Sequence, residues 1–207
     1  MDRVSQLIID GVNFGRTLIG LTTRPYQTYR MIVSHGKSGE LLFIGLLLSG
    51  YFALASIVKI AAFRPFLLTQ QFVLLALGAA SGVLFAAASM VVMGSLFRKT
   101  ASFLTVILAW SYTLIPTVLW FFATSMLYVL LPPPRTTSAM GILFSLLFII
   151  FSASLLWWKV TLSYLTLRFT LKLDLVQAIL VGIGCAPIMT AWAIGMYRLG
   201  VFKVPFL

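Results

Sequence analysis

Residues 139–158 read AMGILFSLLFIIFSASLLWW, a stretch without a single charged side chain. At 1.5 Å per residue, an α-helix of this length is ~30 Å long, which matches the hydrocarbon thickness of a bilayer. Four more apolar runs follow the same pattern, and nearly every charge lies between the runs or at their ends. We therefore predict an all-α fold, a polytopic helical membrane bundle with five transmembrane helices.

The apolar runs are bounded by charges, prolines and aromatic residues. The third run is longer than a bilayer requires, so we expect it to be tilted, kinked at Pro116 or extended beyond the membrane. Residues 160–173 continue the fourth run as an amphipathic stretch. Asp174 and Gln177 have the spacing of a capping box, which predicts the start of the last helix. The five spans are expected at about residues 40–58, 70–97, 101–131, 139–158 and 175–198.

Residues 1–39 form a separate segment before the transmembrane domain of residues 40–207. Apolar side chains recur at helical spacing over residues 2–21, which predicts an amphipathic helix. A second short helix is expected to start at Pro25, and its aromatic and basic residues suit the headgroup region. The first helix lies either in the membrane interface or against the cytoplasmic side of the bundle or a partner. The sequence favours neither position.

The chain is strongly basic, with 15 Lys and Arg against 4 Asp and Glu, and 61% of its residues are hydrophobic. In a soluble protein this charge would suggest nucleic acid. In a membrane protein it predicts contact with the anionic headgroups of the phospholipid bilayer, and we expect no nucleic-acid partner. The residues expected to contact headgroups or a partner are Arg16, Arg24, Tyr26, Tyr29, Arg30, Arg98, Lys99, Trp157, Trp158, Lys159, Arg168 and Lys172.

The basic residues also predict an orientation. If the N-terminus is cytoplasmic, ten Lys and Arg lie on the cytoplasmic side and five lie on the other side. The positive-inside rule then places the N-terminus in the cytoplasm and the C-terminus outside.

Few polar groups are expected inside the membrane. Helix rise places Lys59 and Lys159 at interfaces, and Glu40 and Asp174 begin helices, where a negative charge suits the helix dipole. The hydrocarbon layer is then expected to hold no ionisable side chain except the thiol of Cys185. With one histidine and four acids in the chain, we predict no catalytic residue, no metal site and no cofactor, and hence no enzyme.

Small residues recur every four positions on three of the predicted spans. Such faces let helices approach closely in lipid, so we expect them to pack within the chain, with docking of another subunit as the alternative. Pro116 and Pro187 free backbone carbonyls, either in ordinary kinks or in a binding site. The small-residue faces are Gly45, Ser49 and Ala53 in the first span, Gly78, Gly82 and Ala86 in the second, and Gly182 and Ala186 in the fifth.

Two segments suggest a family. Residues 23–32 read TRPYQTYRMI, and residues 157–178 join two tryptophans and a lysine to a basic amphipathic stretch and a helix that opens on Asp174. Together with five apolar helices, they resemble bacterial members of the Yip1-domain superfamily, over about residues 10–200. The acidic Leu-Tyr-Gly-Pro motif of the Rab-binding eukaryotic relatives is missing. The resemblance implies a non-enzymatic multi-pass protein of the bacterial inner membrane with a cytoplasmic N-terminus.

The expected function is that of a scaffold or accessory subunit in a larger membrane assembly, as a homo- or hetero-oligomer. The alternative is a permease-like subunit for a lipid or another hydrophobic substrate. Such a subunit would need a separate ATPase, because no nucleotide-binding motif is present. A third possibility is membrane shaping by the N-terminal helix.

Overall fold

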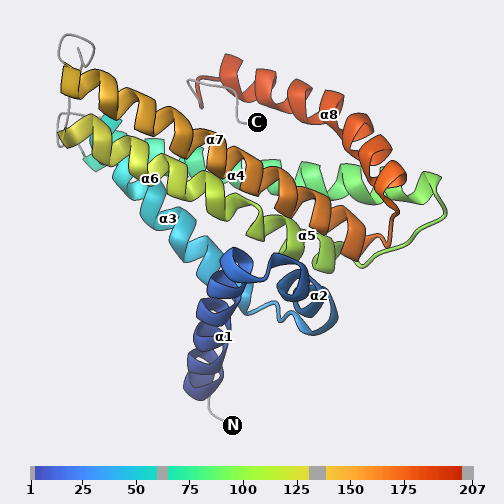
Figure 1. Ribbon diagram of the computed structural model, residues 1–207. Coiled ribbons are helices and arrows are strands. Elements are labelled where there is room, and N and C mark those ends of the chain that lie inside the picture. Colours follow the sequence, from blue (N-terminus) through green and yellow to red (C-terminus); the bar gives the residue numbers. More distant parts are fainter. Residues whose placement is uncertain (1–2, 60–64, 131–138, 202–207) are drawn as a thin grey trace.

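The computed structural model describes residues 3–59, 65–130 and 139–201 (Figure 1). These residues form eight helices and no strand, so the predicted all-α fold is confirmed. The helices are α1 (Arg3–Thr23), α2 (Pro25–His35), α3 (Glu40–Lys59), α4 (Pro65–Leu96), α5 (Phe103–Tyr112), α6 (Leu114–Leu130), α7 (Ala139–Thr170) and α8 (Leu175–Arg198).

Five segments of the described helices are long and apolar enough to cross a membrane, as predicted. The chain is therefore a multi-pass membrane protein. The side chain of Lys59 and the expected end of the third span at Leu131 lie outside the described residues. The five segments are Glu40–Ile57, Phe66–Leu96, Phe103–Leu127, Ala139–Thr170 and Leu175–Arg198.

The third segment consists of two consecutive helices. Helix α5 ends at Tyr112 and α6 begins at Leu114, so the break lies at Thr113, shortly before Pro116. A proline has no N–H for the carbonyl four residues earlier, and its ring clashes with that carbonyl, which here belongs to Tyr112. Helix α8, in contrast, runs without interruption through Pro187.

Helix α7 extends well beyond the predicted span. It continues from Ala139 to Thr170, a length of ~48 Å at 1.5 Å per residue. Its first part is largely exposed, as expected of a surface that faces lipid, whereas Leu162, Leu165 and Leu167 are buried in the bundle. The amphipathic stretch after residue 158 therefore belongs to the same helix, because its apolar side chains pack on neighbouring helices.

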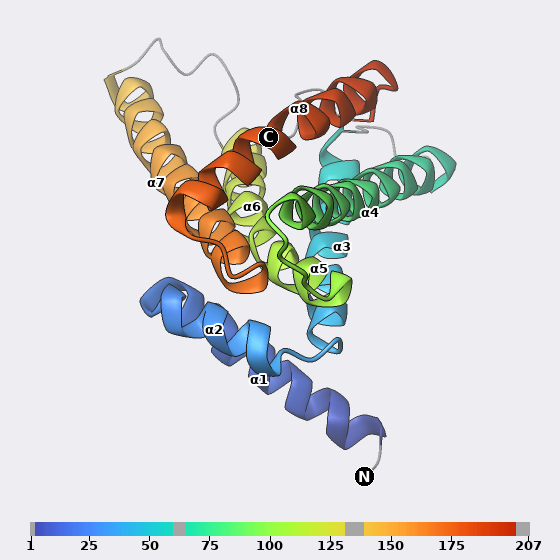
Figure 2. The same cartoon turned by 90° about the vertical axis from the view of Figure 1, so that its right-hand side faces the viewer.

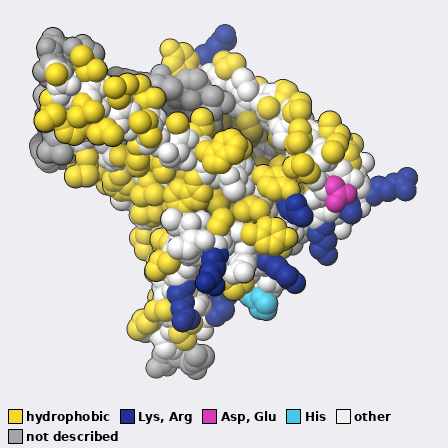
Figure 3. Space-filling view, viewed as in Figure 1, with side chains coloured by type: hydrophobic (Ala, Val, Ile, Leu, Met, Phe, Trp, Pro, Cys, Tyr) yellow, Lys and Arg dark blue, Asp and Glu magenta, His cyan; other side chains and the backbone are white. Residues whose placement is uncertain are grey.

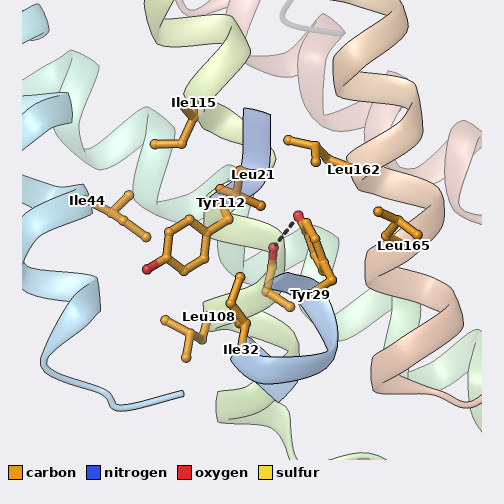
Figure 4. Close-up of a cluster of buried hydrophobic side chains, with 10 residues drawn as sticks. Leu21, Tyr29, Ile32, Ile44, Leu108, Tyr112, Ile115, Leu162 and Leu165 are labelled. Atoms are coloured by element: carbon orange, nitrogen blue, oxygen red, sulfur yellow. Dashed lines mark hydrogen bonds between the residues drawn. The ribbon is translucent and has the colours of Figure 1, made fainter. Parts of the chain in front are cut away.

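The N-terminal helices lie together at one end of the bundle, and the N-terminus extends away from it (Figures 1 and 2). A first buried cluster joins these two helices to α3, α5, α6 and α7, and includes Leu21, Tyr29 and Ile44 (Figure 4). A second cluster joins α4, α5, α7 and α8, around Met90, Val106 and Val181. The bundle and the N-terminal helices thus share a core.

Candidate functional site

A pocket lies among the membrane-spanning helices, with walls supplied by α3, α4, α5, α6, α7 and α8. Its volume is about 80 Å³, several times the ~10–15 Å³ that one water molecule needs. Most of the wall is apolar, and much of it is aromatic. The aromatic lining residues are Tyr51, Phe52, Trp110, Phe121 and Trp192.

The aromatic wall is held by contacts between helices. The rings of Tyr51 on α3 and Phe121 on α6 stack with centroids 4.8 Å apart. The indole N–H of Trp192 on α8 donates to the hydroxyl of Ser81 on α4, at 3.2 Å. Gly82 makes room for this indole, since a Cβ atom at Gly82 would lie 2.8 Å from the ring. The pocket is therefore built by specific packing.

Lys159 of α7 lines this pocket and, among the described lining residues, is the one with a charged side chain. On α3 the pocket is lined by Leu48, Tyr51 and Phe52, near the middle of the span Glu40–Ile57. Lys159 is half-buried beside them, so it lines a space between helices, whereas the sequence predicts a position at an interface, and its contact with headgroups stays a prediction. That prediction took the helix to leave the membrane after Trp158, whereas α7 continues to Thr170. An ionisable side chain within a membrane-spanning helix commonly marks a functional site.

Thr117 of α6 adds an aliphatic hydroxyl to the pocket wall. Its buried hydroxyl has no hydrogen-bond partner among the described residues. The hydroxyls of Thr113 and Thr124 instead donate to the carbonyls of Trp110 and Trp120, each at 2.7 Å. A buried hydroxyl without a partner costs about 1–3 kcal/mol. The pocket thus combines a mostly apolar wall with the ammonium group of Lys159 and the unpartnered hydroxyl of Thr117.

Tyr29 of α2 lies inside the protein, although the sequence predicted a contact with headgroups or a partner. Its side chain is fully buried and its hydroxyl donates to the carbonyl of Ala109 at 3.2 Å (Figure 4). The hydroxyl of Thr166 on α7 donates to Tyr29 at 3.3 Å. Burial raises the pKa of Tyr29 above its ordinary value, so the phenol stays neutral. The prediction failed because the partners lie far away in the chain.

Helix α1 is also held on the bundle, through polar and aromatic contacts at the start of α3. The ring of Phe14 stacks on that of Phe43 with centroids 5.7 Å apart. The buried carboxylate of Asp10 pairs with Lys37 at 3.6 Å. It also touches Gly39, where a Cβ atom would overlap its oxygen. This carboxylate therefore lies at the N-terminal end of α3, where the helix dipole favours a negative charge.

Glu40 does more than begin a helix. It is buried, with 6% of its surface exposed, and its carboxylate accepts a hydrogen bond from the hydroxyl of Tyr112 on α5. Asp174 keeps the predicted capping box, because its backbone N–H donates to the side chain of Gln177 at 3.3 Å. The sequence predicted both helix starts and missed the long-range contact of Glu40.

A second face of α1 is exposed. Ile8, Val12 and Ile19 lie on it with 63%, 57% and 68% of their surfaces exposed. Their spacing places them on one side of the helix, away from buried Asp10 and Leu21. Helix α1 therefore contacts the bundle, and a position in the membrane interface stays a prediction that concerns this second face.

Basic side chains gather over α1, α2 and the neighbouring ends of the bundle (Figure 3). Arg168 donates to the hydroxyl of Tyr164 at 2.5 Å, and its guanidinium lies 5.9 Å from the ring centre of Tyr26. Trp157 is 75% exposed, while Trp158 donates to the carbonyl of Leu21 at 3.3 Å. Among the basic residues predicted to contact headgroups, Lys99 is half-buried, and the exposed ones are Arg16, Arg24, Arg30, Arg98, Arg168 and Lys172.

The three small-residue faces have different environments. The face on α4 is packed within the chain, since Gly78, Gly82 and Ala86 are all buried. The faces on α3 and α8 are open, because Cβ atoms at Gly45 and Gly182 would meet nothing within 4 Å. Helix α8 packs through a different face. That face includes Ala178, Val181, Cys185 and Ala193. On α3 Ser49 is half-buried and Ala53 is exposed, and on α8 Ala186 is exposed.

No family model, curated protein or solved structure matches this chain. The resemblance to the Yip1-domain superfamily therefore stays a prediction from the sequence. Within the described residues, no group of three or more His, Cys, Asp and Glu side chains could hold a metal ion.

Proposed function

We propose that this chain is a non-catalytic multi-pass membrane protein that binds a lipid or another hydrophobic molecule in the pocket between its helices. In this proposal it works as a permease-like subunit, with a separate ATPase supplying energy if transport is active. The observation that carries the proposal is the apolar pocket lined by Trp110, Phe121 and Trp192. Pockets of this kind, apolar with a few convergent polar groups, are typical of ligand sites.

The free energy that an empty pocket costs the folded protein supports a functional role. A void in a packed core destabilises a protein, because its lining atoms lose van der Waals contacts. The unpartnered hydroxyl of Thr117 adds to that cost. A bound molecule would restore the lost van der Waals contacts by filling the void, and it would offer the hydroxyl of Thr117 a hydrogen-bond partner.

A second candidate is the role of scaffold or accessory subunit in a larger membrane assembly, of Yip1 type. It is supported by the open faces at Gly45 and Gly182. In lipid, small residues on an outer helix face allow another helix to approach closely. The two roles are compatible, since a ligand-binding subunit can also belong to an assembly.

We also propose that the protein lies in the bacterial inner membrane with its N-terminus in the cytoplasm. The exposed basic side chains over α1 and α2 support this orientation through the positive-inside rule. A reporter fused to the N-terminus should then be active only if it functions in the cytoplasm. A reporter active only outside the cytoplasm would contradict the orientation.

The proposed function is tested by filling the pocket. Ala79 of α4 lines it, whereas Ala53 of α3 is exposed, so Ala79→Phe and Ala53→Phe form a matched pair. The full chain is purified in mild detergent, and bound hydrophobic molecules are measured by native mass spectrometry. We expect a bound molecule in the original protein and in Ala53→Phe, and its loss in Ala79→Phe. Equal occupancy in both variants would contradict the proposal.

A further inference from the structure

We propose that the pocket selects a single-chain amphiphile with an acidic headgroup, which pairs with Lys159 while the chain lies against the aromatic wall. This inference rests on the proposed function and names the chemical class of the ligand. It is carried by the placement of an ammonium group and an unpartnered hydroxyl in the wall of one apolar pocket.

The charge of Lys159 favours an acidic ligand. Cations within membrane-spanning bundles pair with acidic or polar groups, and Lys159 already has a contact within the protein. The ammonium group of Lys159 carries three donors. It can therefore bind a ligand anion while it keeps a contact with the protein. A carboxylate or phosphate in the pocket would gain from the low dielectric of the apolar wall around Lys159.

The hydroxyl of Thr117 offers a second contact to the headgroup. Serine and threonine hydroxyls in apolar helices commonly donate to the carbonyl one turn earlier. The hydroxyl of Thr117 has no such partner among the described residues, yet the residue lines the pocket. It can donate to an oxygen of the same acidic headgroup. Two polar groups from different helices, α6 and α7, would then bind one ligand.

The volume of the pocket favours a ligand with a single chain. The pocket volume of about 80 Å³ is below the ~150 Å³ of an engineered cavity that binds benzene. Part of one unbranched chain fits this space better than a lipid with two chains. Trp110 and Trp192 would flank that chain from α5 and α8.

The inference is tested by quenching of tryptophan fluorescence in the full chain, because Trp110 and Trp192 line the pocket. Three bromine-labelled probes carry the same chain and differ in headgroup: a carboxylate, a phosphate and an uncharged alcohol. We expect either acid or both to bind at least about tenfold more tightly than the alcohol, as a hydrogen bond to a charged group implies. The better acid identifies the headgroup.

Four variants locate the effect. Lys159→Met should remove the preference for acid, and Lys159→Arg should keep it. Lys172→Met is the control, because Lys172 is exposed in the turn after α7. Thr117→Val removes the hydroxyl at nearly constant volume, so it should weaken acid binding by about fivefold without lowering the melting temperature. A merely structural role of Thr117 would leave binding unchanged.

The outcomes separate this inference from the proposed function. If acid and alcohol bind equally and Lys159→Met changes nothing, the pocket binds hydrophobic molecules but the inference is overturned. If no probe quenches the original protein, both the inference and the proposed function are overturned. If Lys172→Met removes the preference as strongly as Lys159→Met, the acid binds at the surface and the inference is again overturned.

Discussion

The hydroxyl of Tyr112 on α5 donates a hydrogen bond to the buried carboxylate of Glu40, the first residue of α3. The contact joins residues 72 positions apart in the chain. The ring of Phe14 on α1 stacks on the ring of Tyr112, with centroids 6.2 Å apart. This group of three side chains therefore ties the N-terminal helices to two membrane-spanning helices.

Removing that hydroxyl should destabilise the protein. Tyr112→Phe leaves a buried carboxylate without its donor, so we expect a loss of about 2 kcal/mol, the scale of a hydrogen bond to a charged group. The measurement is thermal or denaturant unfolding in detergent. Tyr197→Phe is the control, because Tyr197 is 54% exposed. Equal stability of the two variants would show that the Glu40 contact contributes nothing.

The close contact between Gly39 and Asp10 predicts that a side chain at position 39 would weaken the packing of α1 on the bundle. In Gly39→Ala the new methyl group would overlap the Asp10 carboxylate, so α1 should detach and become accessible to protease. In Gly15→Ala no atom lies within 4 Å of the new Cβ, and α1 should gain up to about 1 kcal/mol of helix stability. The rate at which α1 is cleaved in limited proteolysis distinguishes the two variants. Slow cleavage of both variants would contradict the proposed docking of α1.

Tyr29 predicts a pH dependence. Burial raises its pKa in the folded state, so the unfolded chain loses this proton first as the pH rises above about 10. The folded protein then holds more protons than the unfolded chain, and stability falls with rising pH. Tyr29→Phe should reduce that fall, measured as the melting temperature between neutral and strongly alkaline pH. An identical alkaline slope in both proteins would contradict the burial of Tyr29.

The packing of Gly82 against Trp192 predicts a difference between two glycines. Gly82→Val would push the indole from its place in the pocket wall and should cost about 1–3 kcal/mol, as overpacking does. Gly45→Val adds the same side chain in open space on α3, and should leave the isolated chain stable. Loss of a co-purified subunit in Gly45→Val alone would support the scaffold role. Equal unfolding temperatures would contradict the packing at Gly82.

The sequence predicts the features of this fold that depend on local pattern. Apolar runs locate the five spans, Pro116 locates the break in the third, and the Asp174–Gln177 pair locates the start of α8. Each of these follows from hydropathy, backbone chemistry or short-range spacing.

The sequence does not predict which side chains meet across the bundle. Tyr29 and Lys159 both have the residue types of a membrane interface, yet their positions depend on helices far away in the chain. The amphipathic stretch after residue 158 does contain a usable signal. Its apolar face indicates that the helix continues past Trp157-Trp158. Lys159 then lies within the helix and can face the inside of the bundle.

The most direct measurement for the central claim is photo-crosslinking with a single-chain acid that carries a diazirine on its chain, followed by peptide mapping of the full protein. Binding in the pocket predicts labels on Leu114, Thr117 and Val118 of α6 and on Met189 of α8, reduced by excess unlabelled acid and lost in Ala79→Phe. Labels confined to exposed side chains of α7 such as Ile142, Leu146 and Ile150, and unaffected by competitor, would contradict a pocket that binds such a molecule.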